Sequence, residues 1–96
     1  MNNIAVYVPN AFTPDENQYN TVFYPVFSTG FSPINFEFSV FNRWGEEVFS
    51  STNLNFVWDG TYEGIPVQVG TYTWYLVYEI EKGIYKDLSG HVNVIR

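Results

Sequence analysis

Residues 71–95 read TYTWYLVYEIEKGIYKDLSGHVNVI, and this stretch decides the fold. Apolar and polar side chains alternate through both halves, which is the period of a β-strand with one buried face. The inward set of the first half is Tyr72, Trp74, Leu76, Tyr78 and Ile80. Because Gly83 separates the halves, the stretch predicts a hairpin of two strands, Thr71–Glu81 and Ile84–Ile95.

The alternation also predicts the register of this hairpin. A three-residue loop of Glu81, Lys82 and left-handed Gly83 gives the pairs Tyr72 with Val92, Trp74 with Gly90, Leu76 with inward-facing Leu88, and Ile80 with Ile84. A glycine opposite Trp74 leaves room for the indole to cover its backbone. A tight Lys82-Gly83 turn would oppose Tyr78 to Asp87, so the longer loop is favoured.

A second hairpin is predicted upstream, where residues 34–51 read INFEFSVFNRWGEEVFSS. Its strands are Ile34–Phe41 and Glu46–Ser51, with Phe36, Phe38 and Val40 facing inward. If Arg43, Trp44 and left-handed Gly45 form the loop, Val40 lies opposite Val48. A four-residue loop would bury Glu47 against Val40, so the three-residue loop is preferred.

The rest of the chain gives weaker strand signals between turn-forming residues. Further strands are predicted at Ile4–Val8 and Thr21–Phe27, with a short one possible at Pro66–Val69, and long connections at Pro9–Asn20 and Ser51–Val69. About six or seven strands joined by long crossings predict an all-β fold, an immunoglobulin-like Greek-key β-sandwich. The length of 96 residues favours a single domain over residues 1–96.

Composition excludes several classes of partner. Ten acids against four bases give a formal charge of -6, and the bases Arg43, Lys82, Lys86 and Arg96 form no cluster. Nucleic acid and anionic membrane surfaces are therefore not expected as partners. No apolar run approaches the ~20 residues of a membrane span, and the chain has no cysteine. A strand signal begins close to Met1, so the chain is either a whole small protein or a piece of a longer one, and we expect the second.

The sequence contains no recognisable set of catalytic residues. His91 is the single histidine, and Asp87, four residues away on one strand, lies too far for a direct hydrogen bond. No nucleophile elbow or carboxylate pair is evident, so an enzyme is not expected. Asp15–Asn20 offers oxygen ligands, but Tyr19 occupies the third calcium-ligand position, which favours a turn. We expect no cofactor and no metal.

Exposed aromatic side chains are the better indication of function. Arg43 and Trp44 lie on a predicted hairpin tip, and Trp58-Asp59-Gly60 ends a polar loop. Each tryptophan is either an anchor for a partner or a packing residue, and the second role is commoner in a small domain. Phe41 with Phe49, and Tyr75 with Val77, are expected to form outward apolar patches unless loop Ser51–Val69 covers one of them.

Five short motifs follow one another along the chain: YVPNAFTP (residues 7–14), FNRWGE (41–46), WDGT (58–61), VGTY (69–72) and GHVNVIR (90–96). Their combination resembles the gliding-motility-associated C-terminal domain, also called the type B sorting domain of the type IX secretion system. The resemblance covers essentially the whole chain. It departs from the family at residues 15–21, where an acidic, glycine-rich loop is usual.

The resemblance implies an immunoglobulin-like module at the C-terminus of large surface or secreted proteins, adhesins among them. Such a module directs its cargo from the periplasm across the outer membrane, and type B domains require translocon components and a cognate outer-membrane partner protein. Candidate contact residues are Arg43, Trp44, Trp58, Asp59 and Gly60. The competing hypotheses are a carbohydrate- or protein-binding β-sandwich module of an adhesin and a structural spacer.

Overall fold

The computed structural model describes residues 6–14, 22–27, 33, 35–53 and 56–95. Strands account for all the regular structure in these ranges, which confirms the all-β prediction. The strands are β1 (Val6–Tyr7), β2 (Ala11–Phe12), β3 (Val26–Phe27), β4 (Phe36–Phe41), β5 (Glu47–Ser51), β6 (Thr61–Tyr62), β7 (Ile65–Pro66), β8 (Gly70–Glu81) and β9 (Ile84–Val94). Within the same ranges, no helix is long and apolar enough to cross a membrane.

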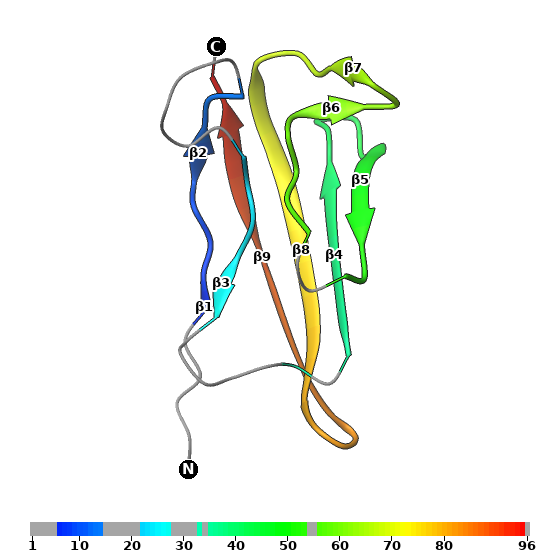
Figure 1. The fold of residues 1–96 in the computed structure, drawn as a ribbon. Coiled ribbons are helices and arrows are strands. Elements are labelled where there is room, and N and C mark those ends of the chain that lie inside the picture. Colours follow the sequence, from blue (N-terminus) through cyan, green and yellow to red (C-terminus); the bar gives the residue numbers. More distant parts are fainter. Residues whose placement is uncertain (1–5, 15–21, 28–32, 34, 54–55, 96) are drawn as a thin grey trace.

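One five-stranded sheet carries the fold, in the order β2-β9-β8-β4-β5 (Figure 1). All its neighbouring strands are antiparallel except β2 and β9, which run parallel. Two small antiparallel pairs, β1 with β3 and β6 with β7, complete the described structure. The β8–β9 turn lies at one end of the molecule, and the β4–β5 tip and the β6–β7 hairpin lie at the other.

The core lies between this sheet and a second layer formed by β1, β3 and the segment that precedes β6 (Figure 1). Phe23 and Trp58 join two parts of that layer, because each backbone N–H donates to the other residue's carbonyl at 2.9 Å. Aromatic rings from both layers fill the space between them. This layered arrangement is consistent with an immunoglobulin-like sandwich.

The β8–β9 hairpin confirms the predicted pairs of Tyr72 with Val92, Trp74 with Gly90 and Leu76 with Leu88. A Cβ built on Gly90 would lie 2.8 Å from the Trp74 ring, which explains the glycine. The predicted pairing at the turn is wrong. Glu81, not Ile80, pairs with Ile84, and a bulge at Ile80 restores the register that a tight Lys82-Gly83 turn would otherwise shift.

The β4–β5 hairpin has the predicted three-residue loop, with Gly45 in the left-handed region at φ +84°. The predicted pair of Val40 with Val48 is wrong, because a register shift sets Val40 opposite Phe49. Val48 is buried and Phe49 stacks on Phe56, so the prediction that Phe49 faces outward is also wrong. The bulge turns two successive side chains toward the core, which simple alternation does not allow.

The remaining differences concern the short strands and the exposure of Leu88. β2, β6 and β7 lie inside segments predicted as long connections, although β7 overlaps the possible strand Pro66–Val69. The predicted strands Ile4–Val8, Thr21–Phe27 and Ile34–Phe41 begin at residues outside the described ranges. Leu88 is on the core-facing side of β9 but remains 40% exposed and does not belong to the core cluster.

Candidate functional site

The tip of the β4–β5 hairpin is fixed by the side chain of Asn42. Its Oδ1 accepts hydrogen bonds from the backbone N–H groups of Trp44 and Glu46, both at 2.9 Å. Its Nδ2 donates to the Glu46 carboxylate at 3.0 Å, so both ends of the amide are used. An asparagine that bonds to the backbone a few residues on is a turn-forming device. The tip is therefore a defined structure that presents the side chains of Arg43 and Trp44.

Trp44 is 75% exposed, which is unusual for so large an apolar side chain. The Arg43 guanidinium lies over its ring, with Cζ 5.4 Å from the ring centroid. A cation in this position is attracted to the negative face of the indole. The two residues thus form one amphipathic projection with an apolar ring and a positive charge. An exposed tryptophan beside an arginine is a common anchor in protein interfaces.

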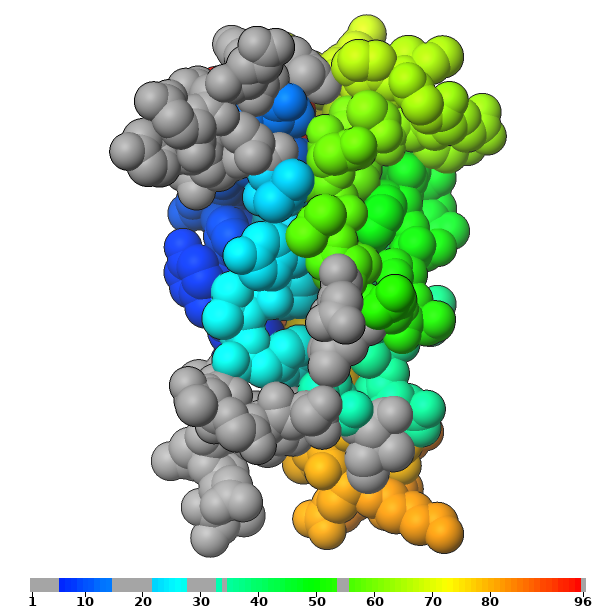
Figure 2. Space-filling view, viewed as in Figure 1, coloured from blue at the N-terminus to red at the C-terminus, as the bar shows by residue number. Residues whose placement is uncertain are grey.

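The β6–β7 hairpin provides the opposite wall of a groove beside Trp44. Its two-residue turn places Glu63 and Gly64 at positive φ, 55° and 82°, the geometry of a type I′ turn. This turn leaves Tyr62 and Ile65 with exposed side chains next to the tip. The groove between the two hairpins has a volume of about 410 Å³. Figure 1 shows the two hairpins together at one end of the molecule, and in Figure 2 the β6–β7 hairpin forms the outer surface of that end. We call this groove, lined by Trp44, Tyr62 and Ile65, the end groove.

The end groove has an acidic rim. The charge of Glu63 and then that of Glu46 raise the pKa of the Tyr62 phenol, with smaller contributions from burial and Glu47. Like charges disfavour ionisation of the phenol, so Tyr62 stays a neutral hydrogen-bond donor at physiological pH. The groove therefore offers apolar rings surrounded by carboxylates, which suits an apolar side chain with basic neighbours.

A second groove lies on the other side of Trp44, with a volume of about 470 Å³. It extends along the connection into β8, where Val69 is exposed, and reaches the exposed His91 on β9. Arg43 also lines it. Trp44 thus stands between two concave surfaces, and both are available to a partner that contacts this end of the sandwich.

Trp58 has a different environment from Trp44. It is 1% exposed and packs against the rings of Phe12, Phe49 and Tyr72. Its indole Nε1 donates to the carbonyl of Thr61 at 2.9 Å. A buried indole with a satisfied N–H is a core residue. Of the two roles that the sequence allows for Trp58, the structure supports packing, and the side chain offers no surface to a partner.

Asp59 and Gly60 shape the turn that follows this tryptophan. The Asp59 carboxylate accepts hydrogen bonds from the Thr61 backbone N–H at 3.1 Å and from the Thr61 hydroxyl at 2.7 Å. Gly60 is buried at φ +82°, and a Cβ there would lie 2.9 Å from Cγ of Pro14. The structure thus brings Arg43 and Trp44 together on an exposed tip and places the WDG turn in the wall of the core.

Tyr62, Ile65 and Val69 were not among the residues predicted to bind. A two-residue Glu63-Gly64 turn between Tyr62 and Ile65 was the available signal, because glycine in such a turn indicates a hairpin. Among the described residues, no group of three His, Asp or Glu side chains is arranged to hold a metal ion. The predicted turn at Asp15–Asn20 lies outside those residues.

Comparison with known proteins identifies the type of domain. Residues 6–94 match the family described as CHU_C type IX secretion signal domain. No curated protein matches the chain, and no solved structure matches it. The match extends across every strand from β1 to β9.

Proposed function

Because the chain belongs to the CHU_C type IX secretion signal domain family, we propose that its folded surface, rather than a linear segment, is what the export machinery recognises. The family is one of secretion signals, not of enzymes. Membership implies interaction with the type IX secretion machinery and export to the cell surface or the extracellular space.

We propose that residues 1–96 act as one non-enzymatic sorting domain for an attached cargo protein. Translocon components and a cognate outer-membrane partner bind it after its transit into the periplasm. One observation carries the proposal: Trp44 is 75% exposed on a tip whose backbone N–H groups are hydrogen-bonded to the Asn42 side chain. A linear signal would not require a packed core, which includes fourteen buried apolar residues in the described part of the chain.

The contact surface in this proposal is the end groove with Arg43 and Trp44. An indole that enters a complementary pocket loses most of its exposed apolar area, and such residues contribute the largest share of binding energy. The carboxylates on the rim favour a partner with basic residues around that pocket. Asp59 and Gly60 contribute indirectly, by fixing the turn that leads into β6.

An export assay tests the proposal. The chain is fused to a fluorescent protein that carries a signal for entry to the periplasm, in a bacterium with a type IX system and the cognate partner. Wild-type fusion is expected outside the outer membrane, while Trp44→Ala is expected to reduce export about tenfold, the effect of losing a binding hot spot. Tyr7→Ala removes another exposed ring, on β1, and serves as the matched control. Normal export of Trp44→Ala would contradict recognition at this tip.

The exposed indole also favours a second function, a carbohydrate- or protein-binding module of an adhesin. Aromatic rings at the edge of a groove stack on sugar rings, and the end groove has this form. The two functions give different results in the same assay. Retention of the wild-type fusion in the periplasm, together with Trp44-dependent binding to a glycan array, would favour the adhesin module over the sorting signal.

A further inference from the structure

The face of the five-stranded sheet that points away from the core has a second concave surface. Strand register places Glu37 of β4, Val77 of β8 and Asp87 of β9 in one row across three neighbouring strands. Side chains directly opposite one another on a sheet face have Cβ atoms about 5 Å apart. The two carboxylates therefore flank Val77 on either side. Glu37 and Asp87 are both exposed.

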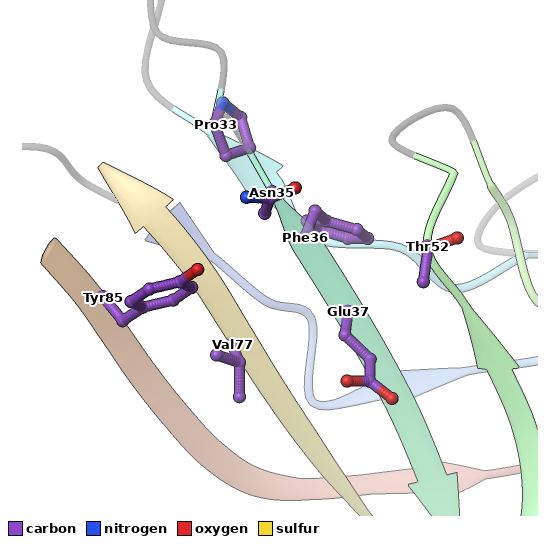
Figure 3. A pocket seen from close by; sticks show the side chains of 7 residues that line it. All are labelled: Pro33, Asn35, Phe36, Glu37, Thr52, Val77 and Tyr85. Atoms are coloured by element: carbon purple, nitrogen blue, oxygen red, sulfur yellow. The ribbon is translucent and has the colours of Figure 1, made fainter. Parts of the chain in front are cut away.

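Two tyrosines border this row. Tyr75, 41% exposed, donates a hydrogen bond from its hydroxyl to Oδ2 of Asp87 at 3.2 Å. Tyr85, 56% exposed, lines a depression of about 450 Å³ together with Glu37 and Val77. Figure 3 shows these three side chains on neighbouring strands. We call the set Glu37, Tyr75, Val77, Tyr85 and Asp87 the outer-face site.

The outer-face site is negative, and no described basic side chain shares its row. Lys86 is opposite buried Tyr78 and so belongs to the core-facing side of β9, Lys82 lies in the turn, and Arg43 is at the other end of the sheet. Burial first, and then the charges of Asp87 and Glu37, raise the pKa of the Tyr75 phenol. Both carboxylates thus act on the same ring. A cation over Val77 would neutralise two acids and lie beside aromatic rings.

The adjacent edge of β9 supplies a second, independent observation. In the described part of the chain, β9 pairs with β8 along its length, and β2 joins its other edge only at Asn93 and Val94. From Ile84 to Val92, no described strand pairs with that edge. Exposed Ile84 and Leu88 lie along this part of the strand, on its core-facing side, with Lys86 between them. An unpaired edge with apolar neighbours is a template for an added strand.

We propose that an extended segment of a partner protein, in which basic residues alternate with apolar ones, pairs with the β9 edge and places a lysine or arginine side chain between Asp87 and Glu37 over Val77. Successive side chains of an added strand point to opposite faces. Basic residues then lie on the outer face, and apolar residues lie beside Ile84 and Leu88. The net charge of -6 favours such a basic segment over a second copy of this chain.

The site is distinct from the end groove, and the proposal does not depend on the proposed export function. A test uses the full chain and a short synthetic peptide of alternating valine and lysine, with binding measured by calorimetry. Glu37→Gln/Asp87→Asn is expected to weaken binding about tenfold or more, because charge-assisted contacts are lost. Asp15→Asn/Glu16→Gln removes the same charge from two acids that belong to neither binding surface and is the matched control, expected to change affinity less than twofold.

Two results would overturn the proposal. Equal weakening by both double variants would mean that the peptide responds only to net charge. Unchanged affinity of a peptide N-methylated at alternate residues, which cannot form one set of backbone hydrogen bonds, would exclude pairing with the edge. The proposed binding instead requires loss of affinity on N-methylation. Both double variants exchange acids for amides, and circular dichroism verifies that they are folded.

Discussion

The two tryptophan turns of this domain have nearly the same local chemistry and opposite roles. In each, an Asn or Asp side chain accepts hydrogen bonds from groups two or four residues on, Asn42 in one and Asp59 in the other. In each, a glycine follows in the left-handed region, Gly45 at φ +84° and Gly60 at φ +82°. Yet Trp44 projects into solvent and Trp58 is enclosed.

The difference arises from contacts distant in sequence. The backbone of Trp58 exchanges two hydrogen bonds with that of Phe23, and the two rings are in edge contact. These contacts place the Trp58 turn in the second layer. None of the described backbone hydrogen bonds joins Trp44 to another layer. Turn chemistry thus determines the path of the backbone, while the neighbouring layer determines whether the side chain stabilises the fold or remains available to a partner.

Replacing each tryptophan should give the largest contrast. We expect Trp58→Ala to lower the free energy of unfolding by about 3–5 kcal/mol, because it leaves a cavity among aromatic rings and removes the bond to Thr61. Trp44→Ala should change it by less than about 0.5 kcal/mol, as exposed positions usually do. Urea denaturation followed by far-ultraviolet circular dichroism measures both.

Trp58→Phe is the matched control, because it keeps a ring and removes the indole N–H. It should cost less than Trp58→Ala. Similar losses for Trp44→Ala and Trp58→Ala would show that the exposed tip contributes to the core, which would remove the contrast between the two turns.

Replacing Gly45 and Gly60 should give a smaller difference in the free energy of unfolding than replacing the two tryptophans. An L-residue at either position bears the cost of a left-handed backbone, about 1–2 kcal/mol. Gly45→Ala should lower the free energy of unfolding by this backbone cost alone, since no atom beyond the adjacent residues lies within 4 Å of the added Cβ. Gly60→Ala should lose roughly 1 kcal/mol more, because its Cβ would lie 2.9 Å from Pro14 and overpacking adds strain. Thermal unfolding of both variants measures the difference, and equal losses would contradict close packing of Pro14 on the WDG turn.

Much of the main sheet could be predicted from the sequence. Alternation through 71–95 predicts the burial of Tyr72, Trp74, Leu76 and Tyr78 and pairs Trp74 with Gly90 correctly, but it does not predict that Glu79 is buried. It could not predict the bulges at Val48 and Ile80, because an extra residue leaves no compositional mark and only its partner strand reveals it. Nor could it predict that Leu88 is 40% exposed, since alternation indicates a face but not the extent of the layer covering it.

The candidate site was predicted only in part, for the same reason. The tip with Arg43 and Trp44 follows from local turn chemistry and could be anticipated. Separating Trp44 from Trp58 requires the contact with Phe23, which is thirty-five residues from Trp58 in sequence and has no local signal. Tyr62 and Ile65 line the end groove because the β6–β7 hairpin packs beside the β4–β5 tip. This tertiary contact also has no local signal in the sequence.

A third turn, between β8 and β9, tests the comparison with a side chain that titrates. Glu79 is buried, and its carboxylate accepts a hydrogen bond from the Gly83 backbone N–H at 2.6 Å and another from the Asn35 amide. These bonds, to Gly83 first and then to Asn35, lower the pKa of Glu79, although burial opposes them. Glu79 thus stabilises its turn as Asn42 and Asp59 stabilise theirs, but only while it is ionised.

Glu79→Gln should lower the free energy of unfolding less than the tryptophan or glycine substitutions do, because the amide oxygen still accepts one hydrogen bond. A carboxyl group whose pKa is lower in the folded state stabilises fully above its unfolded pKa, about 4.3. That stabilisation is lost as the pH falls through the lower folded pKa of Glu79. Wild type should therefore be more stable than Glu79→Gln at pH 7, and the difference should disappear on acidification. Glu81→Gln, exposed at the same turn, is the control in urea titrations at several pH values. A difference that persists at acidic pH would mean that shape, not charge, holds the turn.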